Sequence, residues 1–294
     1  MDITPENIRL IETGLRSEFN SGFAGVEPLY SRIATTVPSN GSGETYAWLK
    51  DIPGMREWIG DRRIRQLSQD GYRITNRLFE STISVKRTDI EDDQIGHYST
   101  LARTMGDQAA RHPDVLVFDG VELGFDARCY DGQNFFDADH PVGEDGQEES
   151  VSNFADGAEP AWYLLDTTRP LRPFIFQNRT RAEFETLEGG SEVAFMRDEH
   201  LYGTRARGEA GFGFWQLAYA SKQPLTSANV IAARTAMEGF TNDFGEKLGV
   251  QPNILMVSSA NRAAAETLIG AEKIDNAYNT LKGAFDLIVA PRLS

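Results

Sequence analysis

The sequence has little cysteine, histidine or lysine. It contains one cysteine, Cys129, with four histidines and six lysines in 294 residues. A single cysteine cannot form an internal disulfide, so we expect a reducing compartment. No apolar run approaches the roughly 18–20 residues that a membrane helix needs. The first residues also lack the basic start and apolar stretch of a signal peptide, and we expect no membrane association.

Basic residues are missing from one long window. The net charge is −15, and no Lys or Arg occurs between residues 129 and 168. Such a run is usually a solvated loop, but it is also suited to a basic partner or a divalent cation. An acidic surface repels nucleic acid, whereas separated acidic and basic segments are typical of a self-associating protein. The window holds ten acids: Asp131, Asp137, Asp139, Glu144, Asp145, Glu148, Glu149, Asp156, Glu159 and Asp166.

Two helices are well signalled in the first half of the chain. Thr4 and Pro5 favour a helix start, and a stripe at helical spacing follows until residues 20–22. That stripe has to pack on its own core or on a neighbouring chain. A second helix of some thirty residues is expected after the acids at 89–93, kinked or broken at Pro113. The two expected apolar stripes are Ile8, Ile11, Leu15 and Phe19, then Ile95, Tyr98, Leu101, Ala102, Met105 and Ala109.

The rest of the chain mixes strands and shorter helices. Residues 63–67 and 72–76 flank a turn signal at Gln69–Gly71, and strands are expected at 82–86, 162–165, 173–176, 253–257 and 285–291. The region 200–221 also has the aromatic, alternating character of strands. A helix capped at Thr226 or Ser227 is expected to bury Phe240 and Phe244, and Ser259 is expected to cap another. The fold class is therefore α+β.

The stretch 129–143, CYDGQNFFDADHPVG, combines residues that catalytic and metal sites use. A hydrolase would need Cys129 as nucleophile, His140 as base and Asp139 to orient that base. A lone cysteine is more often a small buried apolar residue. Zinc would need more Cys and His at short spacing, and the calcium-loop pattern is incomplete. We expect no metal, no cofactor and no catalytic residue, and we expect His97 to be a hydrogen-bonded structural histidine.

Five long motifs carry a resemblance to a known family. They are ETYAWLKDIPGMREWIGDR, GYRITNRLFESTISVKRTDIEDDQIGHY, CYDGQNFFDADHPVG, WYLLDTTRPLRPFIFQNR and YGTRARGEAGFGFWQLAYA. In this order, along nearly the whole chain, they resemble the major head subunit of Mu-like phages and prophages. The acidic piece GEDGQEES matches no motif of that family. The resemblance implies a Hong Kong 97-type capsid fold and a major capsid protein, and it makes CYDGQNFFDADHPVG an ordered structural loop.

The resemblance also implies a division of the chain. It predicts an N-terminal arm at 1–40 that crosses to a neighbour, and an extended E-loop at 41–82. A peripheral domain with the long spine helix follows at 83–128. Mixed strands and the acidic loop at 129–225 complete the peripheral and axial domains. Residues 226–294 form the axial helix–strand–helix and the final strand.

The partners are likewise implied by the resemblance. The chain would bind itself in hexamers and pentamers of an icosahedral shell enclosing double-stranded DNA, with DNA touched only by non-specific proximity. A scaffold or protease, and portal proteins, would act during assembly in the bacterial host cytoplasm, with a decoration protein as a further possible partner in the virion. Lys–Asn crosslinks, known in the wider fold, are not expected here.

One contact between subunits is expected from charge. A basic cluster in the E-loop region would lie on an acidic cluster of a neighbouring subunit, at ~0–1 kcal/mol for each exposed pair. Symmetry would repeat the contact in every subunit. The basic residues are Arg56, Arg62, Arg63 and Arg65, and the acidic residues are Asp89, Glu91, Asp92 and Asp93.

Overall fold

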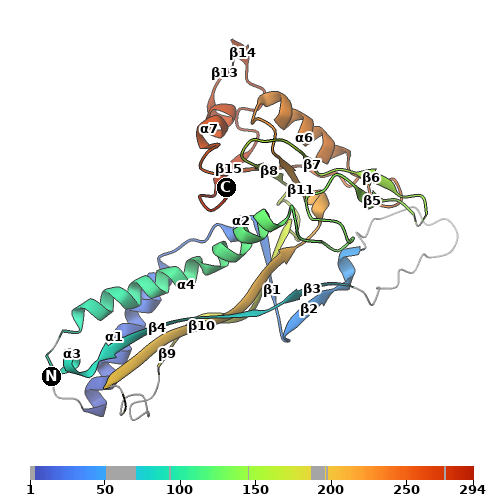
Figure 1. Ribbon diagram of the computed structural model, residues 1–294. Helices are drawn as coiled ribbons and strands as arrows, with labels where there is room; N and C mark the ends of the chain where they lie inside the picture. The colour runs from blue at the N-terminus through green and yellow to red at the C-terminus, as the bar shows by residue number, and fades with distance from the viewer. Residues whose placement is uncertain are drawn as a thin grey trace.

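The computed structural model describes residues 4–50, 71–92, 94–144, 146–186, 196, 198–274 and 276–294. Two sheets organise these residues (Figure 1). A long four-stranded sheet has the order β1-β9-β10-β4, and a five-stranded sheet has the order β15-β12-β8-β11-β7. Helices α1 and α4 cover the long sheet, while α6 and α7 lie with the second sheet at the other end of the molecule.

The N-terminal helix α1 (Pro5–Ala24) begins as predicted. The Thr4 hydroxyl accepts a hydrogen bond from the Asn7 amide at 3.2 Å, and Pro5 occupies the first turn. The helix continues two residues past the expected end. Its stripe, with Leu15 and Phe19 almost fully buried, packs on α4 of the same chain. The apolar face is therefore covered within the subunit, which is one of the two alternatives that the sequence left open. The crossing of the N-terminal arm to a neighbour stays a prediction.

The long helix α4 (Gly96–Leu123) has 28 residues and keeps Pro113 inside it. It packs against α1 on one side and against β10, β9 and β4 on another. Ala102, Met105 and Gly106 are buried at these contacts. Leu101 was predicted to be buried, but it is 49% exposed. The reason is that small residues further along the helix, Ala102 and Gly106, make the contact with α1.

The long sheet is built from unusually long strands. β9 (Phe174–Thr186) and β10 (Glu199–Phe212) pair antiparallel, with register shifts beside Arg207. β4 (Arg77–Lys86) pairs antiparallel along β10 and includes the predicted strand at 82–86. β1 (Ala34–Pro38), which follows the one-turn helix α2 (Tyr30–Ile33), pairs parallel with the start of β9. The sheet therefore joins segments from the first half and the second half of the chain.

The excursion between β1 and β4 is closed at its base. β2 (Gly43–Tyr46) pairs antiparallel with β3 (Tyr72–Thr75), and a short 3₁₀ turn η1 (Ala47–Lys50) follows β2. The Tyr46 hydroxyl donates to the Gln177 side chain at 2.9 Å, and the Phe212 amide donates to the Tyr72 hydroxyl at 3.2 Å. The strand expected at 63–67 and the first two residues of its turn, Gln69 and Asp70, lie outside the described residues.

The second sheet gathers four predicted strand regions. β8 (Trp162–Leu165) lies between β12 (Ile254–Val257) and β11 (Ala218–Ser221), and β15 (Asp286–Val289) pairs parallel with β12. β7 (Phe154–Ala155) completes the edge beside β11. The segment 166–173 therefore links two different sheets rather than two paired strands. The buried side chains of β8 and β12 form the centre of the larger core.

The C-terminal helices correct two expectations. α6 (Ser227–Gly239) is capped by Thr226, whose hydroxyl accepts from the Asn229 amide at 3.3 Å. The helix ends at Gly239, so Phe240 is buried beyond it, and Phe244 is 43% exposed in the following loop. α7 (Arg262–Gly270) begins after Asn261, without a side-chain cap from Ser259. A small hairpin of β13 (Lys273–Ile274) and β14 (Ala277–Tyr278) follows.

The remaining described elements are short. α3 (Arg87–Glu91) follows β4, β5 (His140–Val142) pairs with β6 (Glu149–Val151), and the 3₁₀ turn η2 (Trp215–Leu217) precedes β11. The acidic segment 143–148 joins β5 to β6, which makes it the connection of a small hairpin. No described helix has the length and apolar character needed to cross a membrane.

Candidate functional site

The stretch 129–143, CYDGQNFFDADHPVG, folds as an ordered loop after α4. Phe135 and Phe136 are buried below it in the larger core. The Phe135 ring stacks on Phe212 at 4.6 Å between centroids and contacts Phe174 at 5.2 Å. These apolar anchors hold the polar residues of the loop at fixed positions above the junction of the two sheets. The stretch is therefore locked into the fold by its aromatic pair.

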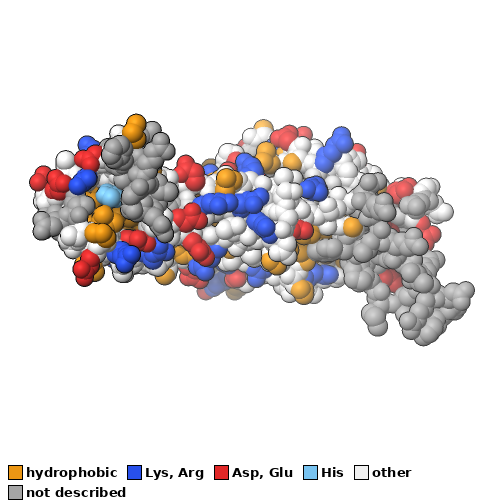
Figure 2. Space-filling view, turned by 90° about the horizontal axis from the view of Figure 1, so that it is seen from below, with side chains coloured by type: hydrophobic (Ala, Val, Ile, Leu, Met, Phe, Trp, Pro, Cys, Tyr) orange, Lys and Arg blue, Asp and Glu red, His pale blue; other side chains and the backbone are white. Residues whose placement is uncertain are grey.

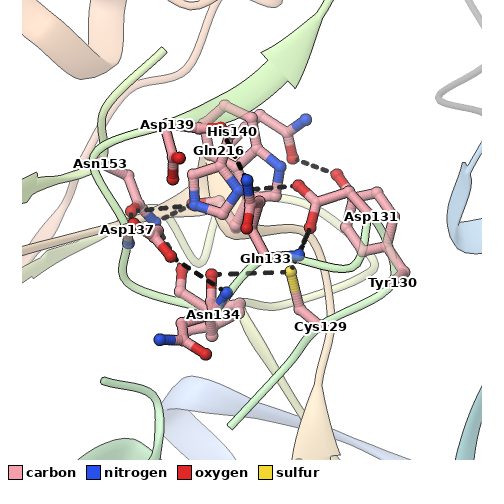
Figure 3. A network of polar contacts seen from close by, with 12 residues as sticks. Cys129, Tyr130, Asp131, Gln133, Asn134, Asp137, Asp139, His140, Asn153 and Gln216 are labelled. Atoms are coloured by element: carbon pink, nitrogen blue, oxygen red, sulfur yellow. Dashed lines mark hydrogen bonds and ion pairs between the residues drawn. The ribbon is translucent and has the colours of Figure 1, made fainter. Parts of the chain in front are cut away.

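A buried carboxylate–imidazole pair lies at the centre of this loop (Figure 3). His140 is fully buried, and its Nδ1 lies 2.7 Å from Asp131 Oδ2. Its ring stacks on Trp215, with 4.0 Å between centroids and 10° between planes. The buried structural histidine is therefore His140. His97, expected in that role, is exposed on α4.

Asn153 indicates that the second imidazole nitrogen of His140, Nε2, carries a hydrogen. Its amide nitrogen donates to the Phe135 carbonyl at 2.8 Å, and its oxygen accepts from the Asp137 amide at 2.9 Å. The orientation of the amide is set by these two backbone groups, so the oxygen faces His140 Nε2 at 3.2 Å. An oxygen can only accept, and Nε2 therefore carries a hydrogen.

The Cys129 thiol is also engaged by Asp131. Its Sγ donates to Asp131 Oδ1 at 3.0 Å, and the residue is only 6% exposed. Burial, followed by the charge of Asp131, raises the pKa of the thiol far above its ordinary value. A cysteine nucleophile needs the opposite, a stabilised thiolate with a base beside it. Asp131 lies between the thiol and the imidazole, so Cys129 has the environment of a structural thiol.

The third residue of the hydrolase hypothesis is elsewhere. Asp139 is exposed, and a hydrogen bond with Asp137 raises the pKa of its carboxyl group. The residue that orients His140 is Asp131, which sequence spacing alone did not select. Burial by itself would raise the pKa of Asp131, but hydrogen bonds from His140 and Cys129 outweigh it and leave that pKa lowered. The geometry therefore does not support the hydrolase.

Cys129, Asp131 and His140 form the one group of potential metal ligands within the described ranges. Their ligand atoms lie within 4.8 Å of one another. Each of the three already has a hydrogen-bonding partner in the loop. Structural zinc sites use four ligands, mostly Cys and His. The network is complete as hydrogen bonds, and its chemistry needs no ion.

The predicted subunit contact is only partly described. Arg56, Arg62, Arg63, Arg65 and Asp93 lie outside the described residues. The others lie on or just after α3, at the end of the molecule where α1 begins (Figure 1). Asp89 accepts a hydrogen bond from the Tyr98 hydroxyl at 2.5 Å, and Glu91 lies 3.4 Å from Arg87. Asp92 is exposed.

The acidic window is not one uniform surface. Asp166 is fully buried, where it accepts hydrogen bonds from the Thr168 hydroxyl at 2.6 Å and the Gln251 amide at 3.0 Å. Asp131 is bound to His140, as described above. Glu148 and Glu149 are exposed on the β5–β6 hairpin. Burial therefore divides the window into structural carboxylates and surface acids.

This architecture defines a class of protein. A long helix packs on a long mixed sheet, and an excursion closed by β2 and β3 and a separate five-stranded sheet complete the fold. This is the Hong Kong 97-type fold of phage major capsid proteins. The family model "Mu-like prophage major head subunit gpT" matches residues 8–293. The chain belongs to this family.

Relatives and solved structures agree with this assignment. The chain is 39% identical to the Mu-like prophage FluMu major head subunit of Haemophilus influenzae, covering 92% of this chain and 91% of that protein. It is 38% identical to the major capsid protein of Escherichia phage Mu over the full length of both. A subunit of the bacteriophage JBD30 procapsid superposes with a TM-score of 0.84 at 42% identity, covering 98% of this chain and 99% of that one.

A second JBD30 structure, of the capsid, gives a TM-score of 0.76 at 30% identity, with 90% of each chain covered. The predictions of family, fold class and function are thereby confirmed: the chain is a major capsid protein of the Mu-like type. Its role is structural, as expected for a component of a phage head.

Proposed function

We propose that copies of this chain assemble as hexamers and pentamers into an icosahedral shell that encloses double-stranded DNA. Assembly takes place in the bacterial host cytoplasm, and the chain itself catalyses no reaction. The observation that carries this proposal is the full-length likeness to the JBD30 procapsid subunit. The raised pKa of the Cys129 thiol supports the non-catalytic part.

The two sheets correspond to two proposed domains of the subunit. We assign the long sheet with α4 to the peripheral domain, and the second sheet with α6 and α7 to the axial domain near the capsomer centre. Supporting this assignment, the two sheets lie at opposite ends of the molecule and have separate helical cover (Figure 1). The segment after β2 would act as the E-loop.

Other head components would bind this shell. Scaffold, protease and portal proteins are the assembly partners expected of such a subunit, and a decoration protein would bind from outside. One solved JBD30 capsid is decorated with minor capsid protein trimers, which supports the last of these for a related shell. The net charge of −15 favours loose, non-specific proximity to packaged DNA.

Electron microscopy of the purified protein tests the shell directly. Expressed with its phage partners, the wild-type chain should give closed particles, or capsomers when the partners are omitted. A protein that stays monomeric at high concentration with those partners present would contradict the proposal. An SDS gel of mature particles should show only the monomer band, because we expect no Lys–Asn crosslink, and a ladder of multimers would contradict that part.

The charged subunit contact has its own test. We propose that the cluster Arg56, Arg62, Arg63 and Arg65 lies against Asp89, Glu91, Asp92 and Asp93 of a neighbour. The described acids of that cluster support this, because Asp92 is exposed and the Arg87–Glu91 pair is itself half exposed.

The double variant Arg62→Glu/Arg63→Glu should impair assembly while the subunit stays folded by circular dichroism. A matched reversal of the exposed pair Arg262→Glu/Lys273→Glu changes the net charge equally, away from this contact. Equal loss of particles in both variants would indicate a general charge effect, and normal particles from the first would refute the contact.

A further inference from the structure

A cavity of about 450 Å³ opens between α4, the end of α1 and the long sheet. Four of its lining residues are Phe23, Tyr30, Phe79 and Phe176. Small residues also line it, including Ala109, Ala182, Ala206 and Gly208. Protein interiors are normally close-packed, with few voids larger than a water molecule. The position of small residues opposite aromatic ones leaves this space open.

The sheet itself helps to form the cavity. The pairing of β9 with β10 shifts register on both sides of Arg207, where Arg205 pairs with Glu183, Arg207 with Thr180 and Gly208 with Asn178. Such bulges re-aim side chains and are common next to binding sites. On the opposite wall α4 carries Pro113, which leaves the local helix without one amide donor. Both irregularities occur at the same cavity.

One enclosed polar atom of the cavity lacks a partner. His112 Nε2 is buried, yet it has no hydrogen bond within the described chain. Asn178 and Arg207 are only partly buried and Thr180 is exposed, so water can reach these side chains. Native proteins pair nearly all their buried polar groups. The unpaired His112 Nε2 beside an aromatic cavity therefore points to a ligand that supplies its partner.

The charge of the cavity is positive. Arg181 and Arg207 both line it, and the Arg181 guanidinium lies 4.7 Å from the centre of the Phe23 ring. Among the described residues that line the cavity, none is Asp or Glu. Viewed from below, the molecule shows a group of basic side chains near the middle of this face, with acidic side chains beside it (Figure 2). Burial, followed by the charge of Arg77, lowers the pKa of His112, so its imidazole is neutral at pH 7.

We propose that this cavity is a docking site for a segment of a partner protein that inserts a large apolar side chain and pairs an adjacent carboxylate with Arg207 and Arg181. The aromatic walls fit the apolar side chain, and the volume lies in the range of ~300–1,000 Å³ that suits small ligands and short peptide segments. Guanidinium groups bind carboxylates in a planar fork. A neutral or basic segment would leave both arginines unpaired.

The chemistry can be tested on the full-length protein with defined probes. N-acetyl-Phe-Glu amide and N-acetyl-Phe-Gln amide differ only in the carboxylate. Both are titrated into protein with ¹³C-labelled alanine methyl groups, and the shifts of Ala109, Ala182 and Ala206 are followed by NMR. The Glu peptide should bind about tenfold more tightly than the Gln peptide, as one charge-assisted interaction would give. Equal affinities would overturn the proposal.

Three variants test whether the peptides bind in this cavity or elsewhere on the protein. Arg207→Gln should remove the preference for the Glu peptide, whereas Arg205→Gln, two residues earlier on β10 and outside the cavity, should keep it. Ala206→Leu fills the cavity and should abolish binding of both peptides while the melting temperature shows a folded protein. Binding that survives Ala206→Leu would place the peptides elsewhere and contradict the site.

A nucleic acid is the competing occupant. A short duplex DNA that shifts the same three methyl groups, and competes with the Glu peptide, would show a phosphate site and overturn the proposal. The inference rests on the proposed shell function only for the source of the partner. Peptide binding is measured on subunits, so a failure of shell assembly leaves this test intact.

Discussion

The backbone of Phe19 in α1 touches the position where Gly106 of α4 would carry a side chain. A Cβ added at Gly106 would lie 2.0 Å from the Phe19 carbonyl oxygen. The same contact occurs in reverse, since a Cβ at Gly22 would lie 2.0 Å from the Arg103 carbonyl oxygen. Two glycines, one on each helix, therefore allow α1 and α4 to pack at backbone contact.

Gly106→Ala should push the two helices apart. Overpacking of this kind costs ~1–3 kcal/mol, which outweighs the gain of up to ~1 kcal/mol in helix propensity. Urea denaturation measures the free energy of unfolding. Gly14→Ala is the matched control, because nothing lies within 4 Å of its added Cβ. It should be stabilising, and a stabilising Gly106→Ala would contradict the close helix contact.

Asp131→Asn should destabilise the subunit by ~1–3 kcal/mol, because the amide cannot replace both carboxylate oxygens that contact His140 and Cys129 and leaves a buried polar group unsatisfied. The lowered pKa of Asp131 makes its contribution present above the ordinary carboxyl pKa, and lost as the pH falls through the lowered value. The acid limb of the stability–pH curve should therefore be flatter in the variant. An unchanged acid limb would show that Asp131 contributes nothing to acid unfolding.

The Cys129 thiol should resist modification in the folded protein. Its raised pKa keeps it protonated through the pH range in which ordinary thiols ionise. Reaction with a disulfide reagent should therefore stay slow from pH 7 to pH 9, and become fast after unfolding in urea. Because the folded pKa is raised, the related stability is complete below the ordinary thiol pKa and declines above it. Rapid labelling of the native protein at pH 8 would contradict this environment.

Thr226→Ala should cost ~1 kcal/mol, the typical value of an N-cap, because its hydroxyl accepts the Asn229 amide. Ser259→Ala is the informative comparison. Ser259 was predicted to cap α7, but its side chain does not do so. The exposed serine should therefore be replaceable within a few tenths of a kcal/mol. Equal decreases in melting temperature for the two variants would contradict the prediction that only Thr226 caps its helix.

Local signals predicted much of the secondary structure. Thr4 and Pro5 located the start of α1, and the stripe after residue 95 located α4 despite Pro113. These features depend on residues close in sequence. Leu101 was placed on the wrong face, because the α1–α4 contact follows the glycines and Ala102 rather than the largest apolar residues.

The polar network was beyond such signals. Asp131 was one of three aspartates in the loop, and only its approach to His140 distinguishes it from Asp137 and Asp139. Asn153, 13 residues after His140, was not predicted to belong to the network, although its oxygen faces His140 Nε2. No periodicity reports such contacts, because they depend on the three-dimensional path of an irregular loop. The family resemblance, by contrast, identified the loop as structural.

The base of the excursion determines where mechanical load from a neighbour would enter the subunit. β2 and β3 leave the body side by side, so a pull on residues 47–71 moves both strands together and does not unzip their ladder. The tension then reaches two phenol groups, Tyr46 on Gln177 and Tyr72 on the Phe212 amide. Gln177 and Phe212 lie in the long sheet, so a pull by a neighbouring subunit on this excursion, as proposed for the E-loop, would be transmitted to β9 and β10.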